Sequence, residues 1–181
     1  MIRVFYFLLL ILLSVSCAST KESYTAVQLK KFNEIVDGKP FSINSKRAYP
    51  RVTAALNSLP ANVFLPNGNT INMIDITGHG SVFKFSKDSI TIGDLPYYGE
   101  RQFAGSYNNT NVGIEFDDKI TNYKTSKTKR DNHQIKFTIR DKNSNTESYD
   151  VTLVIYKNLK TRMDIISTHR FPIQYSGIVT E

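Results

Sequence analysis

The stretch Asn132–Tyr156, NHQIKFTIRDKNSNTESYDVTLVIY, decides the fold. In its first part apolar and polar side chains alternate, with Ile135, Phe137 and Ile139 all facing one way. After the polar turn KNSN, the same alternation resumes over residues 148–156. Successive side chains of a β-strand point to opposite faces, so this pattern indicates two half-buried strands. The short polar connection predicts that they pair as an antiparallel hairpin.

Similar short runs continue on both sides of this hairpin. Two further hairpins are predicted, one around Asn67-Gly68 and one around Lys87-Asp88. Residues 45–59 are weakly patterned and predict a loop with a turn of helix near 54–56. Pro172 is expected to mark an edge or a bulge because proline cannot donate to a ladder. The remaining strands are expected at residues 40–44, 62–65, 70–76, 81–86, 89–93, 111–116, 120–127, 163–166 and 171–179.

About eight to ten short strands in sequential hairpins predict a mainly β fold (α+β). The architecture is either an antiparallel meander or a small barrel, and barrel closure would remove the exposed edges. One N-terminal helix is predicted over residues 24–37, with Ser23 or Thr25 as its cap and Gly38 at its end. We expect it to cover one face or the open end of the sheet with its apolar residues, Val27, Leu29, Phe32, Ile35 and Val36.

The composition is that of a globular chain of 181 residues, which favours a single domain. The formal net charge of +7 allows contact with anionic lipid, glycan or nucleic acid, but also describes an ordinary basic surface. The segment 124–130, KTSKTKR, concentrates this charge, either to meet anionic groups or as a solvated hairpin tip. The single cysteine, Cys17, excludes an intramolecular disulfide.

The N-terminus has the features of an export signal. Arg3 precedes the apolar run Val4–Leu13, which would span about 15 Å as a helix, half of a hydrocarbon core of about 30 Å. Small residues follow this run. We therefore predict a signal peptide over residues 1–16, a tether over 17–23 and one β-rich domain over 24–181.

Ser14-Val15-Ser16-Cys17 resembles a bacterial lipobox, although Ser14 stands where leucine is usual. The resemblance implies that Cys17 is lipidated, with a diacylglycerol and an N-acyl chain such as palmitate. Two or more chains are enough for stable anchoring. Ala18 follows in place of the aspartate that retains lipoproteins in the inner membrane, which implies an outer-membrane location facing the periplasm. The alternative is ordinary cleavage next to an unmodified cysteine. Export in either form disfavours a nucleic-acid partner.

An aromatic segment interrupts the strands at Leu95–Phe116, LPYYGERQFAGSYNNTNVGIEF. Aromatic rings at a barrel mouth can stack on a sugar or an apolar molecule. The segment is therefore a candidate binding site for a small apolar or glycan ligand, or for an envelope protein. The same rings can instead plug the barrel end. The candidate binding residues are Tyr97, Tyr98, Phe103 and Tyr107.

No catalytic or metal-binding motif is present. His79, His133 and His169 lie in separate segments without ligand spacing, and no cofactor or metal is expected. Adjacent residues of a strand point to opposite faces of the sheet. Asp117 and Asp118 are therefore not expected to act together in general acid–base catalysis. We therefore predict a non-enzymatic binding or structural module. The alternative is an enzyme with a dispersed active site near the Tyr97/Tyr98 loop that also uses Asp75 and His79.

Three motifs resemble those of a bacterial lipoprotein family known as domain of unknown function 4251. They are Leu95-Pro96-Tyr97-Tyr98-Gly99, Gly113-Ile114-Glu115-Phe116, and the run from Arg170 to Tyr175-Ser176-Gly177. Residues 47–75 are longer than the family pattern. No activity is known for the family, so the resemblance implies an uncharacterised envelope lipoprotein and supplies no mechanism.

Overall fold

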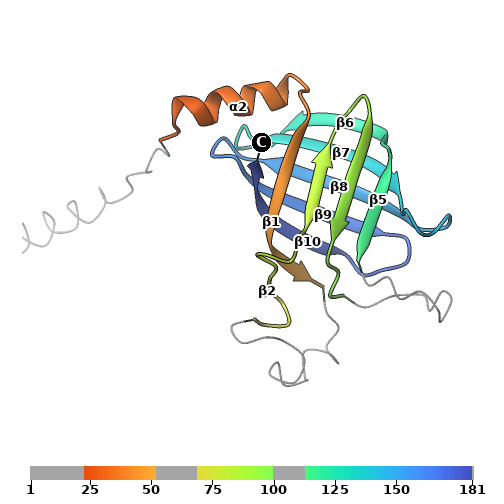
Figure 1. The fold of residues 1–181 in the computed structure, drawn as a ribbon. Helices are drawn as coiled ribbons and strands as arrows, with labels where there is room; N and C mark the ends of the chain where they lie inside the picture. Colours follow the sequence, from red (N-terminus) through yellow and green to blue (C-terminus); the bar gives the residue numbers. More distant parts are fainter. Residues whose placement is uncertain (1–22, 52–68, 100–112, 181) are drawn as a thin grey trace, which may run out of the picture.

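The computed structural model describes residues 23–51, 69–99 and 113–180. These residues form a mainly β domain with one short helix, as predicted (Figure 1). The predicted strand at 62–65 and the helical turn at 54–56 lie outside the described residues. The elements are α2 (Ala26–Val36), β1 (Phe41–Pro50), β2 (Ile74–Asp75), β3 (Val82–Phe85), β4 (Ile90–Leu95), β5 (Ile114–Lys119), β6 (Thr121–Lys127), β7 (His133–Arg140), β8 (Ser148–Ile155), β9 (Lys160–Ser167) and β10 (Ile173–Thr180).

The strands form one antiparallel sheet in the order β5-β4-β3-β1-β10-β9-β8-β7-β6, with β2 added to β1. The first long strand, β1, pairs with the last strand, β10, from Ser42↔Thr180 to Pro50↔Ile173. Consecutive strands β5 and β6 therefore lie at the two edges of the sheet. A backbone hydrogen bond of 2.8 Å from Lys142 N to Glu115 O joins the edge strand β5 to the turn that follows β7, the strand next to the other edge. The result is a nearly closed, barrel-like sheet.

Antiparallel pairing gathers the turns at two ends of the barrel. The helix end is where β1 starts at Phe41, directly after α2, which lies across this end (Figure 1). The turns β3–β4, β6–β7 and β8–β9 lie at the same end, since the ladders align Ser42 with Thr180, Ile178 with Lys160, and Ile155 with His133. The far end is where β1 stops at Pro50 beside Ile173. There β4 ends, β5 starts, and the β7–β8 and β9–β10 turns lie.

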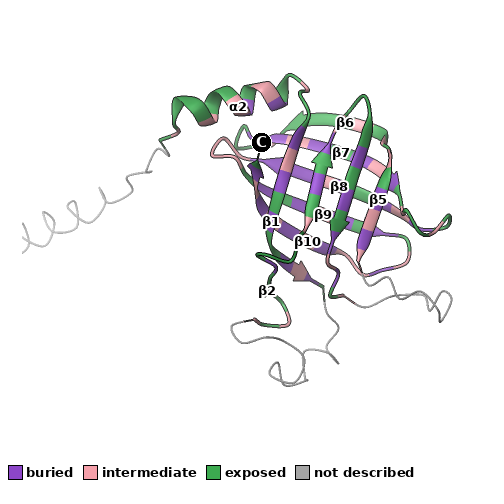
Figure 2. Ribbon diagram, in the orientation of Figure 1, coloured by how far each residue is buried: buried purple, intermediate pink, exposed green. Residues whose placement is uncertain are grey.

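Aromatic rings fill the space enclosed by the sheet. Phe85 lies 5.1 Å from Phe41 and 5.6 Å from Phe137, measured between ring centroids. Phe116 contacts Phe83 at 6.2 Å and Tyr149 at 6.0 Å. Buried and exposed residues alternate along most strands, and the buried ones face this core (Figure 2). Each buried apolar side chain contributes about 1.5–3 kcal/mol, so the interior itself stabilises the barrel.

The helix is fixed at both ends by its own sequence. The Thr25 hydroxyl accepts from Gln28 N at 3.2 Å, and the Gln28 side chain accepts from Thr25 N at 3.0 Å, which makes a capping box. Gly38, with φ of 91°, ends the helix as predicted. The predicted apolar stripe is only partly covered, however. Phe32 and Ile35 are buried, whereas Val27 is 75% exposed and Leu29 and Val36 also reach the surface. A short helix that contacts the sheet through so few side chains leaves the rest of its stripe uncovered.

The prediction of a loop after residue 44 is wrong, because β1 continues to Pro50. The ladder with β10 shifts register between Ser45 and Arg47, which is a β-bulge. The bulge places Lys46 and Arg47 side by side on the exposed face, and the inward residues beyond it include the small Ala48. The bulge therefore breaks the alternation of buried and exposed residues within the stretch that the sequence left weakly patterned. Pro172 stands just before β10 rather than within a strand.

Candidate functional site

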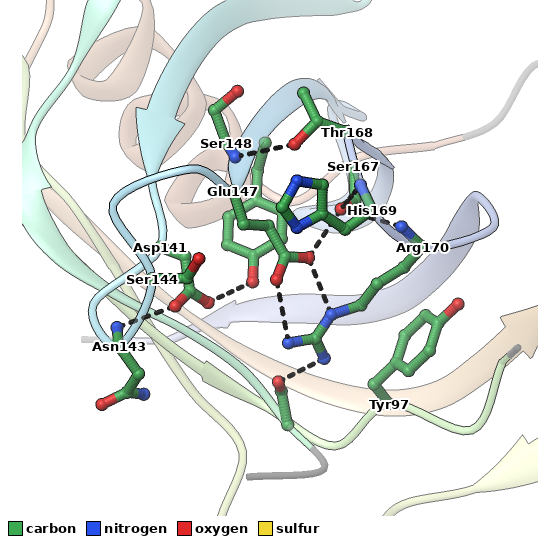
Figure 3. A network of polar contacts seen from close by, with 12 residues as sticks. Tyr97, Asp141, Asn143, Ser144, Glu147, Ser148, Ser167, Thr168, His169 and Arg170 are labelled. Atoms are coloured by element: carbon green, nitrogen blue, oxygen red, sulfur yellow. Dashed lines mark hydrogen bonds and ion pairs between the residues drawn. The ribbon is translucent and has the colours of Figure 1, made fainter. Parts of the chain in front are cut away.

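The three family-like motifs meet at the far end of the barrel, although they lie far apart in the sequence. The LPYYG motif leaves β4, the GIEF motif opens β5, and Leu95 pairs with Ile114 in the ladder between them. Arg170 and Phe171 lie in the β9–β10 turn, and Figure 3 shows Arg170 next to Tyr97 of the first motif. We call the polar contacts that join these segments the far-end network.

A buried ion pair between Arg170 and Glu147 is the centre of the far-end network. Only 3% of the Arg170 side chain and 6% of the Glu147 side chain is exposed. Arg170 Nε donates to Glu147 Oε1 at 2.8 Å, and Arg170 Nη2 donates to Oε2 at 3.3 Å. Ser167 Oγ also donates to Oε1, at 2.7 Å, and it accepts from the backbone N–H of Arg170 at 3.1 Å. The carboxylate is thus held by three donors, which offsets the cost of burying its charge.

The same arginine fixes the base of the aromatic segment. Arg170 Nη1 donates to the carbonyl oxygen of Gly113 at 2.6 Å, and its guanidinium carbon lies 5.2 Å from the centre of the Tyr97 ring. The Tyr97 hydroxyl donates to Phe171 O, and the Tyr175 hydroxyl donates to Pro96 O, each at 3.0 Å. Residues on both sides of the segment 100–112 are therefore bonded to the β9–β10 region. We call these contacts between the three motifs the clamp.

Tyr149 and Asp141 extend the network behind the ion pair. The Tyr149 hydroxyl donates to Asp141, whose backbone N–H donates to Glu147 O at 3.0 Å. Burial raises the pKa of Tyr149 far above its usual value, and the hydrogen bond to Asp141 raises it further. The phenol therefore stays protonated at every physiological pH. It acts here as a fixed hydrogen-bond donor that orients the β7–β8 turn.

Glycine is needed where the LPYYG motif folds back on itself. A Cβ atom added to Gly99 would lie 2.4 Å from the Tyr97 hydroxyl oxygen, which is already bonded to Phe171 O. A second close approach involves Gly93 in β4, where a Cβ would meet the buried Phe116 ring at 2.1 Å. Only a residue without a side chain fits at these positions.

The predicted ligand-binding tyrosines have different environments. Tyr97 is buried under Arg170, with 4% of its surface exposed, so its ring is used within the fold. Tyr98 is 37% exposed. Phe103, Tyr107 and the predicted lipidation site Cys17 lie outside the described residues. Of the four candidates, Tyr98 is the one that the described structure leaves open to a ligand.

The residues of the enzyme alternative do not form one site in the described structure. Asp75 and His79 lie on and beside β2, and the pKa of Asp75 is lowered by hydrogen bonds from Thr77 and weakly by nearby charges that include His79. Tyr97 is buried in the far-end network instead. His133 is buried at the start of β7, where desolvation lowers its pKa and favours the neutral imidazole. Among residues 23–51, 69–99 and 113–180, no group of three or more His, Cys, Asp or Glu side chains is placed to hold a metal ion.

Sequence reasoning named Arg170 within a motif but missed its partners. Glu147, Ser167 and Asp141 stand in or next to turns, where polar residues are expected to be solvated. Glu147 is nevertheless buried, because the β7–β8 turn folds over the β9–β10 turn. The signal that was available is the arginine itself, since a buried guanidinium requires a carboxylate partner.

Comparison with known proteins identifies the family. The family model described as Domain of unknown function (DUF4251) matches residues 24–179. A crystal structure of a DUF4251 family protein from Bacteroides eggerthii has a similar fold, with a TM-score of 0.54 and 13% sequence identity over 85% of this chain and 87% of that chain. No curated protein matches the sequence. In the part of the chain that the structure describes, no helix has the length and apolar character needed to cross a membrane. The chain belongs to the DUF4251 family.

Proposed function

We propose that this DUF4251 protein is a lipid-anchored, non-catalytic module of the bacterial envelope. The lipidated residue is Cys17, the membrane is the outer membrane, and the body faces the periplasm. The body is the barrel, and its far end presents a contact surface to a small apolar or glycan ligand or to another envelope protein. No nucleic acid is involved.

The proposal of a non-catalytic role rests on one observation. The polar groups of the motif residues are bonded to one another and to the backbone inside the protein. Arg170 and Glu147 neutralise each other in a site closed to solvent, and Ser167 is bonded to the same carboxylate. Tyr97 and Tyr175 donate to backbone carbonyls. A catalytic group must reach a substrate, and its reactive atoms therefore face a cleft. These atoms face the protein interior, which supports a role in shape rather than in chemistry.

The position of the clamp supports the proposed contact surface at the far end of the barrel. The clamp bonds Gly113 on one side of the segment 100–112, and Tyr97 on the other side, to the β9–β10 region. Segments held in this way by a rigid scaffold commonly carry binding function. Tyr98 follows Tyr97 in the LPYYG motif and is exposed, and its side chain combines an apolar ring with a polar hydroxyl group.

The anchor is supported by the sequence before the barrel. An apolar run precedes Cys17, and α2 begins at Ala26, shortly after the tether. Two or more acyl chains on one cysteine would hold the barrel stably at a bilayer.

Fatty-acid labelling of growing cells tests the anchor. We expect the wild-type protein to incorporate an alkyne analogue of palmitate, and Cys17→Ala to lose this label completely because its thiol is gone. The matched control, Ser19→Ala, should label like the wild type because it lies beyond the modified residue. Full labelling of Cys17→Ala, or no labelling of the wild type, would refute the anchor.

A further inference from the structure

The helix end of the barrel carries a concentration of positive charge. It includes Lys30 and Lys31 on α2, Lys84 on β3, and Lys129 and Arg130 in the β6–β7 turn, and none of these five side chains has an ion-pair partner among the described residues. Lys87, in the β3–β4 turn, lies over the Tyr123 ring, 5.4 Å from its centre, and three other cations at this end are in ion pairs. Asp131 binds both Lys127 at 3.1 Å and Lys157 at 2.9 Å, and Glu34 binds Lys39 at 3.3 Å.

A partly apolar groove lies within this basic surface. It has a volume of ≈ 650 Å³ and runs between α2 and the outer face of β3 and β4. Ile35, Phe41 and Phe85 belong to its lining, and Lys30, Lys31 and Lys84 are also among its lining residues. Three further lining residues are large, apolar and open to solvent: Val27 is 75%, Ile90 50% and Ile92 37% exposed.

Lysine beside exposed aliphatic side chains is the composition of a surface that lies on a bilayer. The ammonium groups meet anionic headgroups, and the aliphatic groups enter the boundary between headgroups and acyl chains. The stems of the lysines are apolar as well, which lets them lie along the same surface. On a bilayer these exposed apolar groups gain contacts with acyl chains, which water does not provide.

We propose that this helix-end face docks on the surface of a bilayer that contains anionic phospholipid. The inference rests on the proposed function, because the anchor determines which end of the barrel is near the membrane. Fully extended, the tether from Cys17 to Ser23 spans at most about 22 Å. A lipid on Cys17 therefore keeps α2 within a short distance of the headgroups. The charge of the surface selects anionic lipid as the occupant of this face.

Tryptophan fluorescence tests the docking, because the sequence contains no tryptophan. The full chain, as processed by the cell, is prepared as Ile92→Trp and mixed with phosphatidylcholine vesicles, either alone or with phosphatidylglycerol. In the anionic vesicles we expect a blue-shifted emission and quenching by lipids brominated on their acyl chains. In phosphatidylcholine alone, and at high salt, both effects should be lost because screening weakens the attraction. Ile90→Trp serves as a second reporter in case the first variant folds poorly.

Two variants make the assay specific. Ile166→Trp places the reporter on the outer face of β9 toward the far end, where the replaced residue is 57% exposed, and it should show no quenching in either vesicle. The triple variant Lys30→Glu, Lys31→Glu and Lys84→Glu should abolish the response at position 92. It should also weaken the anionic component of binding on the order of a hundredfold.

The possible outcomes separate docking from anchoring. Equal emission at position 92 in both kinds of vesicle would overturn the docking face, as would equal quenching at positions 92 and 166. A response that survives the triple reversal would overturn it too. Failure of the anchor would look different. The protein would not sediment with phosphatidylcholine vesicles, while the response of position 92 to anionic vesicles would persist.

Discussion

Replacing Arg170 with alanine is expected to lower the free energy of unfolding by about 3–5 kcal/mol. The change leaves the buried Glu147 carboxylate without its cation and removes the hydrogen bond to Gly113 O. The clamp also loses the contact between the guanidinium and the Tyr97 ring. For a domain of this size the melting temperature should fall on the order of 10 °C, measured by circular dichroism or calorimetry.

Two further variants test whether the loss of stability comes from the buried ion pair or from the loss of any arginine charge. Arg140→Ala breaks an exposed pair with Asp118, whose N–O distance is 3.1 Å, and should cost at most about 1 kcal/mol. The double variant Arg170→Met with Glu147→Leu removes both buried charges and should recover much of the loss. If Arg170→Ala and Arg140→Ala destabilised the protein equally, the far-end network would not have the role assigned to it.

Replacing Gly177 with alanine is expected to cost up to about 3 kcal/mol through overpacking. A Cβ at this position in β10 would lie 2.4 Å from Asn44 O and 3.0 Å from Ser45 Cα. Both atoms belong to the backbone of β1 next to its bulge, so neither can move without disturbing the β1–β10 ladder. That ladder joins the two halves of the sheet, and the damage should therefore be global.

Urea unfolding of Gly177→Ala measures this cost directly. The matched control is Ser176→Ala, the preceding residue, whose hydroxyl has a single long contact among the described residues, of 3.4 Å with the Tyr49 hydroxyl. It should unfold within about 0.5 kcal/mol of the wild type. A Gly177→Ala protein as stable as the control would show that β1 can move aside, and that this glycine has another role.

The alternating strands were predictable because each one buries a single face. β7 and β8 follow the period of two from end to end, apart from Val154, which is also buried, and their pairing is the one expected from the turn between them. β1 was only half recognised because its bulge puts two exposed residues in succession. The placement of β5 and β6 at opposite edges could not be predicted, since consecutive strands usually pair.

The far-end network could be predicted only in part. Its motif residues Tyr97, Gly113 and Arg170 were noticed through a family resemblance, but their contacts depend on which turns meet in space. Glu147 lies in a polar turn, and nothing in its immediate sequence distinguishes it from a solvated glutamate. Contacts between turns that lie far apart in the sequence leave no pattern in the neighbouring residues. The clamp could therefore be recognised only in the three-dimensional structure.

The central claim is that a lipid on Cys17 holds this barrel at the envelope, and mass spectrometry of the mature protein tests it most directly. The protein is purified in detergent from the cells that make it, and its N-terminal peptide is sequenced. The account predicts a peptide that begins at Cys17 and carries a thioether-linked diacylglycerol and an amide-linked acyl chain. A free thiol at Cys17, or a mature chain that begins at another residue, would contradict it.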